Sequence, residues 1–298
     1  MAENIDFSGV HTALATPFDK DGEVSYGCLE RLVNFQISEG INGIVPVGTT
    51  GETPTLSTGE HLSVVKRTVE IADGRIPIIA GAGSNSTREA VNLTKEAAAA
   101  GADAILQVTP YYNKPNQEGL FLHFSAIAEA TNKPIVLYSI PSRCMIQLDP
   151  DTVARLYEKY PHVCVIKESS GKPERVEALR AACGDAFTIL SGDDSMTLQF
   201  IERSASGVIS VASNALIRPL LQLVKLTEQG ERAASMELDK KLQHFFEALF
   251  LDPNPVPIKH VLVWKQLIES PRARLPLTKI TDSTLRELEA AWEEVKDL

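Results

Sequence analysis

Eight short apolar segments rich in β-branched residues recur along the chain, at residues 10–15, 44–47, 76–80, 104–108, 135–140, 163–166, 187–190 and 207–211. Each segment is too short for a typical helix. Each is also nearly continuously apolar instead of alternating between apolar and polar positions. This pattern is typical of strands that are buried on both faces of a parallel sheet.

Apolar residues at helical spacing fill the stretches between these segments, for example at 28–37 and 90–100. Ser86 precedes the second stretch and Glu89 follows three residues later, which resembles a helix start with acidic support in its first turn. Gly40, Gly74 and Gly101 follow helical stretches, where a left-handed residue commonly ends a helix. The alternation of strands and helices predicts a parallel α/β architecture.

An open doubly wound sheet and a closed (β/α)8 barrel both fit this alternation. The count of eight strands and the absence of a G-x-G-x-x-G sequence after the first strand favour the barrel. After Asn214 the pattern is helical only, at 220–228, 233–249, 258–267 and 284–295. We therefore expect an α/β fold: a (β/α)8 TIM barrel as the catalytic domain over residues 1–224, with a C-terminal helical domain over residues 225–298.

Composition and charge exclude several classes of protein. The 298 residues carry 29 Lys and Arg against 39 Asp and Glu, a formal net charge of −10, which argues against a general nucleic-acid binder or a basic membrane-surface protein. No apolar stretch has the length of a membrane span, and no signal-peptide pattern opens the sequence. The four cysteines form no C-x-x-C pair, so reduced thiols in the cytoplasm are the simplest interpretation.

Polar residues cluster where five of the predicted strands end, which in a barrel is the face that carries the active site. These sequences are GTTGE at 48–52, TPYYN at 109–113, YSIPSR at 138–143, KESS at 167–170 and SGDD at 191–194. Lys167 directly follows an apolar strand. Burial disfavours the ammonium form of a lysine, and the neutral amine is the nucleophile that forms a Schiff base. The alternative is a lysine that extends from the strand end into water.

Hydroxyl groups lie at the same predicted face. Tyr138, Tyr112 and the pair Thr49 and Thr50 supply them, and a chain of hydroxyls can move the protons that imine and enamine chemistry requires. Each tyrosine taken alone would more often pack in the core with its hydroxyl on a backbone carbonyl. The glycines on either side of the threonine pair leave backbone N–H groups free to approach a carboxylate.

Arg143 is a candidate for binding a substrate carboxylate, because a guanidinium group can donate two parallel hydrogen bonds to it. As a single loop arginine it would more often be a surface ion-pair partner. Asp193 and Asp194 are adjacent acidic residues, but no histidine or further carboxylate stands at the spacing of a metal site. We therefore expect no metal, and expect these two residues to cap a helix or stabilise the loop.

The chain resembles the dihydrodipicolinate synthase family, within the pyruvate-dependent class I aldolase superfamily. Matching segments run almost from end to end: besides the strand-end sequences they are IPIIAG at 76–81, LSGDD at 190–194, GVISV at 207–211, PNPVPIK at 253–259 and RLPL at 274–277. The resemblance implies a TIM barrel that needs no cofactor. It also implies a homo-oligomer, usually a homotetramer built as a dimer of dimers.

The resemblance implies that pyruvate forms an imine with Lys167 and then an enamine that attacks the aldehyde of L-aspartate 4-semialdehyde, in lysine and diaminopimelate biosynthesis. Thr49, Tyr112 and Tyr138 would form the proton relay, with Tyr112 reaching in from a neighbouring subunit. The remaining implied roles are the carboxylate of pyruvate for Thr50, the carboxylate of the semialdehyde for Arg143, and the lining of the lysine pocket for Gly192 and Ile209.

Two features bear on which member of the superfamily this is. Thr49 and Arg143 favour the synthases, because sialic-acid lyases tend to have serine and an apolar residue at these positions. Ser139 and Cys144 depart from the family's usual asparagine and threonine, in the loop that carries Arg143. The alternatives are a related pyruvate aldolase acting on a sugar-acid aldehyde, and a catalytically silent ligand sensor. The complete lysine and hydroxyl set argues against the sensor.

Lysine-inhibited members of the family have a second site at the tight dimer interface, and the matching positions are His61, Asn85, Glu89 and Tyr111. There Glu89 would bind the α-ammonium group of an allosteric L-lysine and Asn85 its carboxylate. Alternatively, Glu89 only supports a helix N-terminus. Residues 53, 54 and 58 differ from common inhibited versions, so the sequence leaves inhibition by lysine open.

Overall fold

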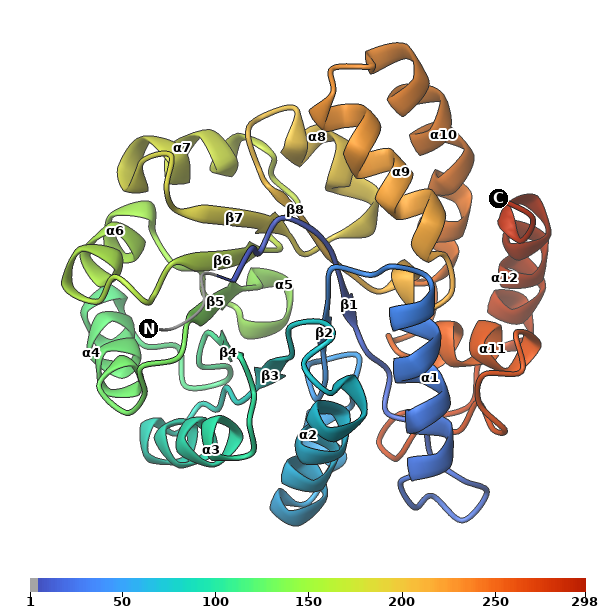
Figure 1. Cartoon of the computed structure of the whole chain (residues 1–298), viewed down its shortest axis with the longest axis horizontal. Coiled ribbons are helices and arrows are strands. Elements are labelled where there is room, and N and C mark those ends of the chain that lie inside the picture. Colours follow the sequence, from blue (N-terminus) through green and yellow to red (C-terminus); the bar gives the residue numbers. More distant parts are fainter. Residues whose placement is uncertain (1–4) are drawn as a thin grey trace.

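Eight parallel strands form the centre of the molecule (Figure 1), in a computed structural model that describes residues 5–298. They are β1 (Gly9–Ala13), β2 (Gly43–Val45), β3 (Ile79–Gly81), β4 (Ala104–Val108), β5 (Ile135–Ser139), β6 (Val165–Glu168), β7 (Thr188–Ser191) and β8 (Gly207–Ser210). Each strand overlaps one of the eight segments predicted from the apolar pattern, so the strand prediction is confirmed.

The strands close into a barrel. Neighbouring strands pair in the order β2-β1-β8-β7-β6-β5-β4-β3, and a single parallel bridge between Ile44 and Ile78 joins the two ends. At this join the Ile44 N–H donates to the Pro77 carbonyl (3.1 Å). On the opposite side, β6 aligns with both β5 and β7 over four residue pairs. The predicted barrel is therefore confirmed over the open sheet.

Helices surround the barrel. They are α1 (Tyr26–Ser38), α2 (Thr58–Ala72), α3 (Thr87–Ala99), α4 (Gln117–Ala128), α5 (Pro141–Cys144), α6 (Pro150–Lys159), α7 (Glu174–Cys183), α8 (Thr197–Ile201) and α9 (Ile217–Glu228), with short 3-10 turns η1 (Thr53–Thr55), η2 (Asp194–Met196) and η3 (Ala212–Asn214). Gly40, Gly74 and Gly101 follow α1, α2 and α3 with φ of 83°, 68° and 96°, as predicted for residues that end helices.

Three further helices form the C-terminal extension: α10 (Arg232–Ala248), α11 (Val256–Trp264) and α12 (Asp282–Val295). They lie along α1 and α9 on one side of the barrel (Figure 1). The boundary expected between residues 224 and 225 falls inside α9, and the division into two domains stays a prediction. No helix within residues 5–298 is long and apolar enough to cross a membrane.

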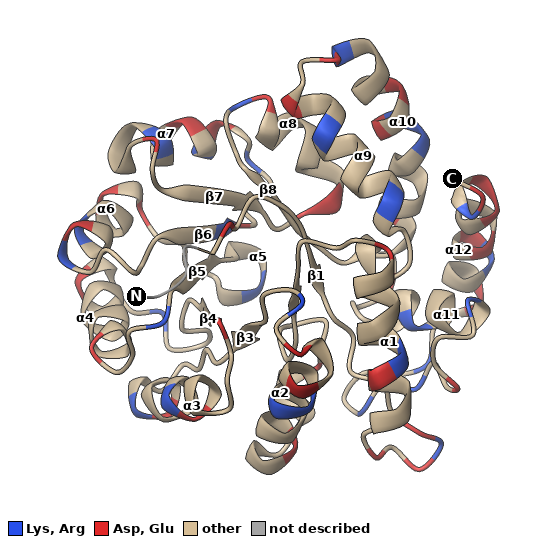
Figure 2. Ribbon diagram, viewed as in Figure 1, with Lys and Arg blue, Asp and Glu red and all other residues tan. Residues whose placement is uncertain are grey.

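Charged residues lie mainly on the outer helices, and apolar residues fill the barrel interior. Acidic and basic residues are spread over the helices (Figure 2). Side chains on β6 alternate between the two faces of the strand: Val165 belongs to the interior cluster and Ile166 to the layer between strands and helices. Because the side-chain period of a strand is two, Lys167 faces the interior.

Candidate active site

Lys167 and Tyr138 lie side by side at the ends of β6 and β5. The two residues are register partners, and Lys167 Nζ lies 4.3 Å from the centroid of the Tyr138 ring, where the face of the aromatic ring attracts a cation. Only 5% of Lys167 and 4% of Tyr138 is exposed. The buried amine does not fit the alternative of a lysine that extends into water.

Gly192 follows β7 and leaves space for the lysine. A Cβ atom at this position would lie 2.8 Å from Lys167 Cε and 1.8 Å from Ser169 Oγ, closer than non-bonded atoms approach. Ile209 on β8 is fully buried in the same interior cluster as Tyr138. The structure therefore places Gly192 against the lysine and Ile209 in the barrel interior, and the substrate-lining roles that the resemblance implies for them stay predictions.

The two aspartates after Gly192 have different environments. Asp194 is buried and accepts hydrogen bonds from the Ser210 hydroxyl and from the backbone N–H groups of Val211 (3.0 Å) and Ala212 (3.1 Å). It thus stabilises its loop, as predicted. Burial raises the pKa of Asp193 to about 6, although the nearby positive charge of Lys167 opposes this rise. No cluster of three His, Cys, Asp or Glu residues suited to a metal ion occurs within residues 5–298.

A buried ion pair holds the end of β6 on the side away from the interior. Glu168 accepts hydrogen bonds from Arg175 Nε (3.2 Å) and from the Ser170 backbone N–H (2.8 Å). Arg175 also donates to the Leu148 carbonyl (2.6 Å). Adjacent residues on a strand face opposite ways, so this anchor fixes the strand without touching the amine of Lys167. Sequence reasoning assigned no role to Glu168 or Arg175.

The Gly48–Glu52 loop, which follows β2, folds back tightly on the strand end. A Cβ on Gly51 would lie 2.8 Å from Val47 Cα, and the Gly51 carbonyl accepts a hydrogen bond from Thr16 Oγ1 (2.7 Å). Thr50 is buried and Thr49 is half-buried. Within residues 5–298 the backbone N–H groups of Thr49 and Thr50 donate to no protein acceptor. Free, adjacent N–H groups of this kind suit a carboxylate ligand.

Residues of the C-terminal extension contact the Gly48–Glu52 loop and hold it in place. Sequence reasoning missed these contacts. Lys259 on α11 forms a buried ion pair with Glu52, and the Arg274 backbone N–H donates to the second Glu52 oxygen (2.9 Å). Burial lowers the pKa of Lys259 to about 8, while the charge of Glu52 opposes the shift. Asn254 Nδ2 donates to Thr50 Oγ1 (3.0 Å). The PNPVPIK sequence was the available signal, because it contains both Asn254 and Lys259.

Arg143 and Tyr112 are both exposed in the single chain. Arg143 lies on α5 and is exposed. Tyr112 is 91% exposed and has a φ of 74° in the loop between β4 and α4. A single chain therefore does not pack Tyr112 against the buried Lys167.

The two departures from the family pattern flank Arg143: Ser139 is the last residue of β5, and Cys144 is the last residue of α5. The Ser139 hydroxyl accepts a hydrogen bond from the Leu148 backbone N–H (3.3 Å). Cys144 is buried, its thiol contacts Thr109, and burial raises its pKa. Both side chains thus support the loop that carries Arg143, and neither lies on β6.

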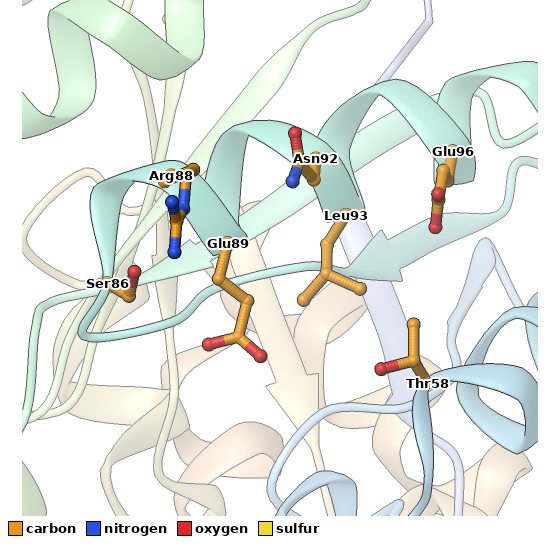
Figure 3. A pocket seen from close by; sticks show the side chains of 7 residues that line it. All are labelled: Thr58, Ser86, Arg88, Glu89, Asn92, Leu93 and Glu96. Carbon is orange, nitrogen blue, oxygen red and sulfur yellow. The ribbon is translucent and has the colours of Figure 1, made fainter.

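A polar pocket of about 380 Å³ lies between α3 and the start of α2. Glu89 and Leu93 project from α3 toward Thr58 (Figure 3). Of the four residues expected at a lysine-binding site, only Glu89 lines this pocket. His61 is buried against the Gly81 carbonyl (2.8 Å), and Asn85 Nδ2 donates to the Tyr111 carbonyl (3.1 Å). The structure thus joins Asn85 to Tyr111, and it places His61 close enough to Glu89 that the negative charge of Glu89 opposes the lowering of the His61 pKa by burial.

Comparison with known proteins decides the family. The model of the dihydrodipicolinate synthetase family matches residues 6–295. The chain belongs to this family. Among its relatives, the 4-hydroxy-tetrahydrodipicolinate synthase of Methanococcus aeolicus is 44% identical over 96% of this chain and 98% of its own length.

Solved structures of the family agree closely with this fold. The 4-hydroxy-tetrahydrodipicolinate synthase from Methylacidiphilum fumariolicum SolV is 47% identical and has a TM-score of 0.95 over 98% of this chain and 97% of its own. Chloride-inhibited dihydrodipicolinate synthase from Acinetobacter baumannii, solved with pyruvate, is 41% identical with a TM-score of 0.94 over 98% and 100%. The lysine-bound enzyme from Cyanidioschyzon merolae is 38% identical with a TM-score of 0.94 over 98% and 99%.

Proposed function

We propose that this member of the family is a 4-hydroxy-tetrahydrodipicolinate synthase, a lyase that condenses pyruvate with L-aspartate 4-semialdehyde in lysine and diaminopimelate biosynthesis. The observation that carries the proposal is the buried amine of Lys167, which lies 4.3 Å from the centroid of the Tyr138 ring. Gly192 leaves room for the Lys167 side chain, because a Cβ at this position would lie 2.8 Å from Lys167 Cε. The names of the relatives support the choice of substrates.

In the first step the Lys167 nitrogen attacks the C2 carbonyl of pyruvate. The carbonyl oxygen takes up protons and leaves as water, which gives a protonated imine. Tyr138 lies against the amine and is the nearest hydroxyl-bearing residue on β5, so it passes protons to and from this centre. Loss of a proton from C3 then gives the enamine. No metal or organic cofactor takes part in this scheme.

In the second step the enamine carbon attacks the aldehyde carbon of the semialdehyde, and the aldehyde oxygen takes up a proton to become a hydroxyl. The amine of the semialdehyde then adds to C2, closes the ring and releases the Lys167 amine. One water leaves over the whole cycle. In this scheme Thr50 and the free N–H groups of its loop bind the carboxylate of pyruvate, and Arg143 binds the carboxylate of the semialdehyde.

Thr49 and Tyr112 complete the proton relay in the proposed mechanism. Tyr112 is 91% exposed in the single chain, which fits a residue that enters the site of a second copy. The proposal therefore includes a homo-oligomer, with the homotetramer of the family as its expected form. Replacing Tyr112 with phenylalanine should lower turnover, and mixing that variant with Lys167→Ala protein should restore part of the activity if the sites are shared.

Borohydride trapping tests the chemistry directly. With pyruvate present, reduction should leave one reduced pyruvyl adduct on Lys167, and Lys167→Ala should form none. Lys259 is an internal control. Like Lys167 it is buried, and burial lowers its own pKa to about 8. Its amine, however, is held in an ion pair with Glu52, so it should not react with pyruvate. An adduct on Lys259, or no adduct at all, would refute the mechanism.

The second substrate is tested through Arg143. Replacing this residue with alanine should raise the KM for the semialdehyde and leave pyruvate trapping at the wild-type rate. If the wild-type protein turned over a sugar-acid aldehyde as fast as the semialdehyde, that result would instead favour the related aldolase. Pyruvate trapping without turnover of the semialdehyde would favour a ligand sensor.

The proposal extends to inhibition by L-lysine. Glu89 lines the pocket beside α3, and its negative charge suits an α-ammonium group. The lysine-bound structure of a relative supports L-lysine as the ligand. A coupled assay with added lysine should show inhibition, and Glu89→Gln should weaken it without changing turnover in its absence. Full activity of the wild-type protein at high lysine would exclude the regulatory role.

A further inference from the structure

We propose that Asn254 is a positioning residue that sets the direction in which the Thr50 hydroxyl donates its hydrogen bond. The two side chains meet through a hydrogen bond from Asn254 Nδ2 to Thr50 Oγ1 of 3.0 Å. Both are buried, with 7% of Asn254 and 2% of Thr50 exposed. The inference rests on the proposed function, in which Thr50 binds the carboxylate of pyruvate.

The chemistry of the two groups explains how the direction is set. A threonine hydroxyl has one hydrogen to donate and two lone pairs to accept with. The amide nitrogen of Asn254 can only donate, so it occupies a lone pair of Thr50 and cannot take its hydrogen. Within residues 5–298 the Thr50 hydroxyl finds no other protein partner. Its hydrogen is therefore available to a ligand that accepts, and an ionised carboxylate is an acceptor only.

The second atom of the Asn254 amide argues that stability alone does not explain this residue. Asn254 Oδ1 is buried and accepts no hydrogen bond from the part of the chain that the structure describes. An unpaired buried carbonyl destabilises a fold, and most such groups in proteins are paired. Asn254 thus donates one hydrogen bond to Thr50 although its amide oxygen is unpaired. A residue whose role is to orient Thr50 for substrate binding would show this combination.

The segment around Asn254 is held firmly enough to act in this way. Five residues further on, Lys259 forms its buried ion pair with Glu52, and it also donates to the Arg272 carbonyl (2.9 Å). The C-terminal extension thus contacts the Gly48–Glu52 loop at two points, Thr50 and Glu52. A fixed donor at Asn254 can therefore preset the Thr50 hydroxyl before pyruvate enters.

The test is Asn254→Asp, which keeps the shape of the side chain but presents only acceptors. The carboxylate would take the Thr50 hydrogen and leave lone pairs facing the substrate. We expect the KM for pyruvate, and the pyruvate concentration at half-maximal borohydride trapping, to rise about tenfold or more. The KM for the semialdehyde and kcat at saturating pyruvate should change by less than about threefold. Asn254→Ala, which only frees the hydroxyl to rotate, should give a smaller rise.

A double-mutant cycle separates action through Thr50 from direct repulsion of pyruvate by the new charge. Thr50→Val removes the hydroxyl, so Asn254→Asp or Asn254→Ala should then raise the KM for pyruvate no further. A rise of the same size in the Thr50→Val background would overturn the proposal. Gln243→Leu is the control, because Gln243 also donates an amide N–H from the extension to the barrel, at the Ser195 carbonyl (3.2 Å). It should leave the KM for pyruvate unchanged.

The two proposals fail in different ways. If wild-type protein forms no trapped adduct with pyruvate, the proposed function is wrong. If the adduct forms normally and Asn254→Asp has the pyruvate dependence of the wild type, only the role of Asn254 is wrong. Should Asn254→Asp not fold, Asn254→Ala with and without Thr50→Val gives the same comparison, and additive effects on the KM for pyruvate would overturn the inference.

Discussion

Replacing Gly192 with alanine should move the reactive lysine out of place. The added Cβ would lie 1.8 Å from Ser169 Oγ, 2.8 Å from Lys167 Cε and 3.1 Å from Lys167 Cγ. Gly192 does not have a backbone conformation in the left-handed region, so backbone strain adds nothing and the damage is steric. Two side chains, one of them the proposed nucleophile, must give way.

The size of the effect follows from these contacts. Forcing an extra methyl group into a packed interior costs about 1–3 kcal/mol of stability. Restoring ordinary contact between the new Cβ and Lys167 requires a shift of roughly 1 Å, and a displacement of that size in a reacting group costs about 100-fold in rate. We therefore expect kcat/KM to fall about 100-fold while the protein still folds.

The assay is the rate of borohydride trapping with pyruvate, measured beside urea denaturation. Adding Ser169→Ala removes the 1.8 Å contact but not the contact with Lys167, so the double variant should regain stability and not activity. Gly27→Ala is the control, because a Cβ on this α1 glycine meets nothing within 4 Å and should stabilise slightly without changing trapping. A folded Gly192→Ala protein with the wild-type trapping rate would refute the steric argument.

Three further predictions concern charge. Glu52→Gln leaves Lys259 buried without its partner and should lower the free energy of unfolding by about 3–5 kcal/mol in urea; a loss below about 1 kcal/mol would contradict the burial of this pair. Arg274 lowers the pKa of Glu60 from 4.5 to about 2, so the stability that Glu60 adds is complete above pH 4.5 and is lost as the pH falls toward 2. The Tm difference between the wild type and Glu60→Gln should shrink over that range, and a constant difference would argue against the ion pair. Burial raises the pKa of Asp193 from 3.8 to about 6, so ionised Asp193 destabilises the fold above pH 6; Asp193→Asn should raise the Tm there and lose this gain below pH 3.8, whereas a gain independent of pH would show another cause.

The barrel was predictable because its signal is local and repeated. Strands buried on both faces must be apolar at every position, and eight such segments recur. The bounds of one strand differ from the prediction because of a proline. The third segment was expected at 76–80, but β3 spans Ile79–Gly81. Pro77 has no N–H to donate to a neighbouring strand, so regular pairing begins only after it. Lys167 was predictable for a similar reason, since it directly follows the apolar segment 163–166, and the ends of barrel strands carry the active site.

The support of the Gly48–Glu52 loop was not predictable in this way. Asn254 and Thr50 are 204 positions apart, and Lys259 and Glu52 are 207 apart. Such contacts leave no periodic pattern in the sequence, because they depend on where the closed barrel meets the C-terminal extension. The role of Gly192 likewise depends on distances across the barrel interior. The strand-end position made Tyr112 a candidate, but its role in the site of a neighbouring subunit could be assigned only through resemblance, because in one chain its side chain is exposed.

The single bridge between Ile44 and Ile78 makes the barrel wall uneven in local stability. The free energy needed to open a segment depends on the hydrogen bonds and packing that it loses. At this join the strands share one bridge, with backbone hydrogen bonds from Ile44 to Pro77 and from Gly81 to Pro46 (3.1 Å each), whereas β6 on the opposite side pairs with each neighbour over four residue pairs. Lys167 therefore lies on a strand with more backbone pairing, and the Gly48–Glu52 loop follows a strand end with less, where opening should require less free energy. The contacts of the C-terminal extension with Thr50 and Glu52 reinforce the wall where its own pairing is thinnest.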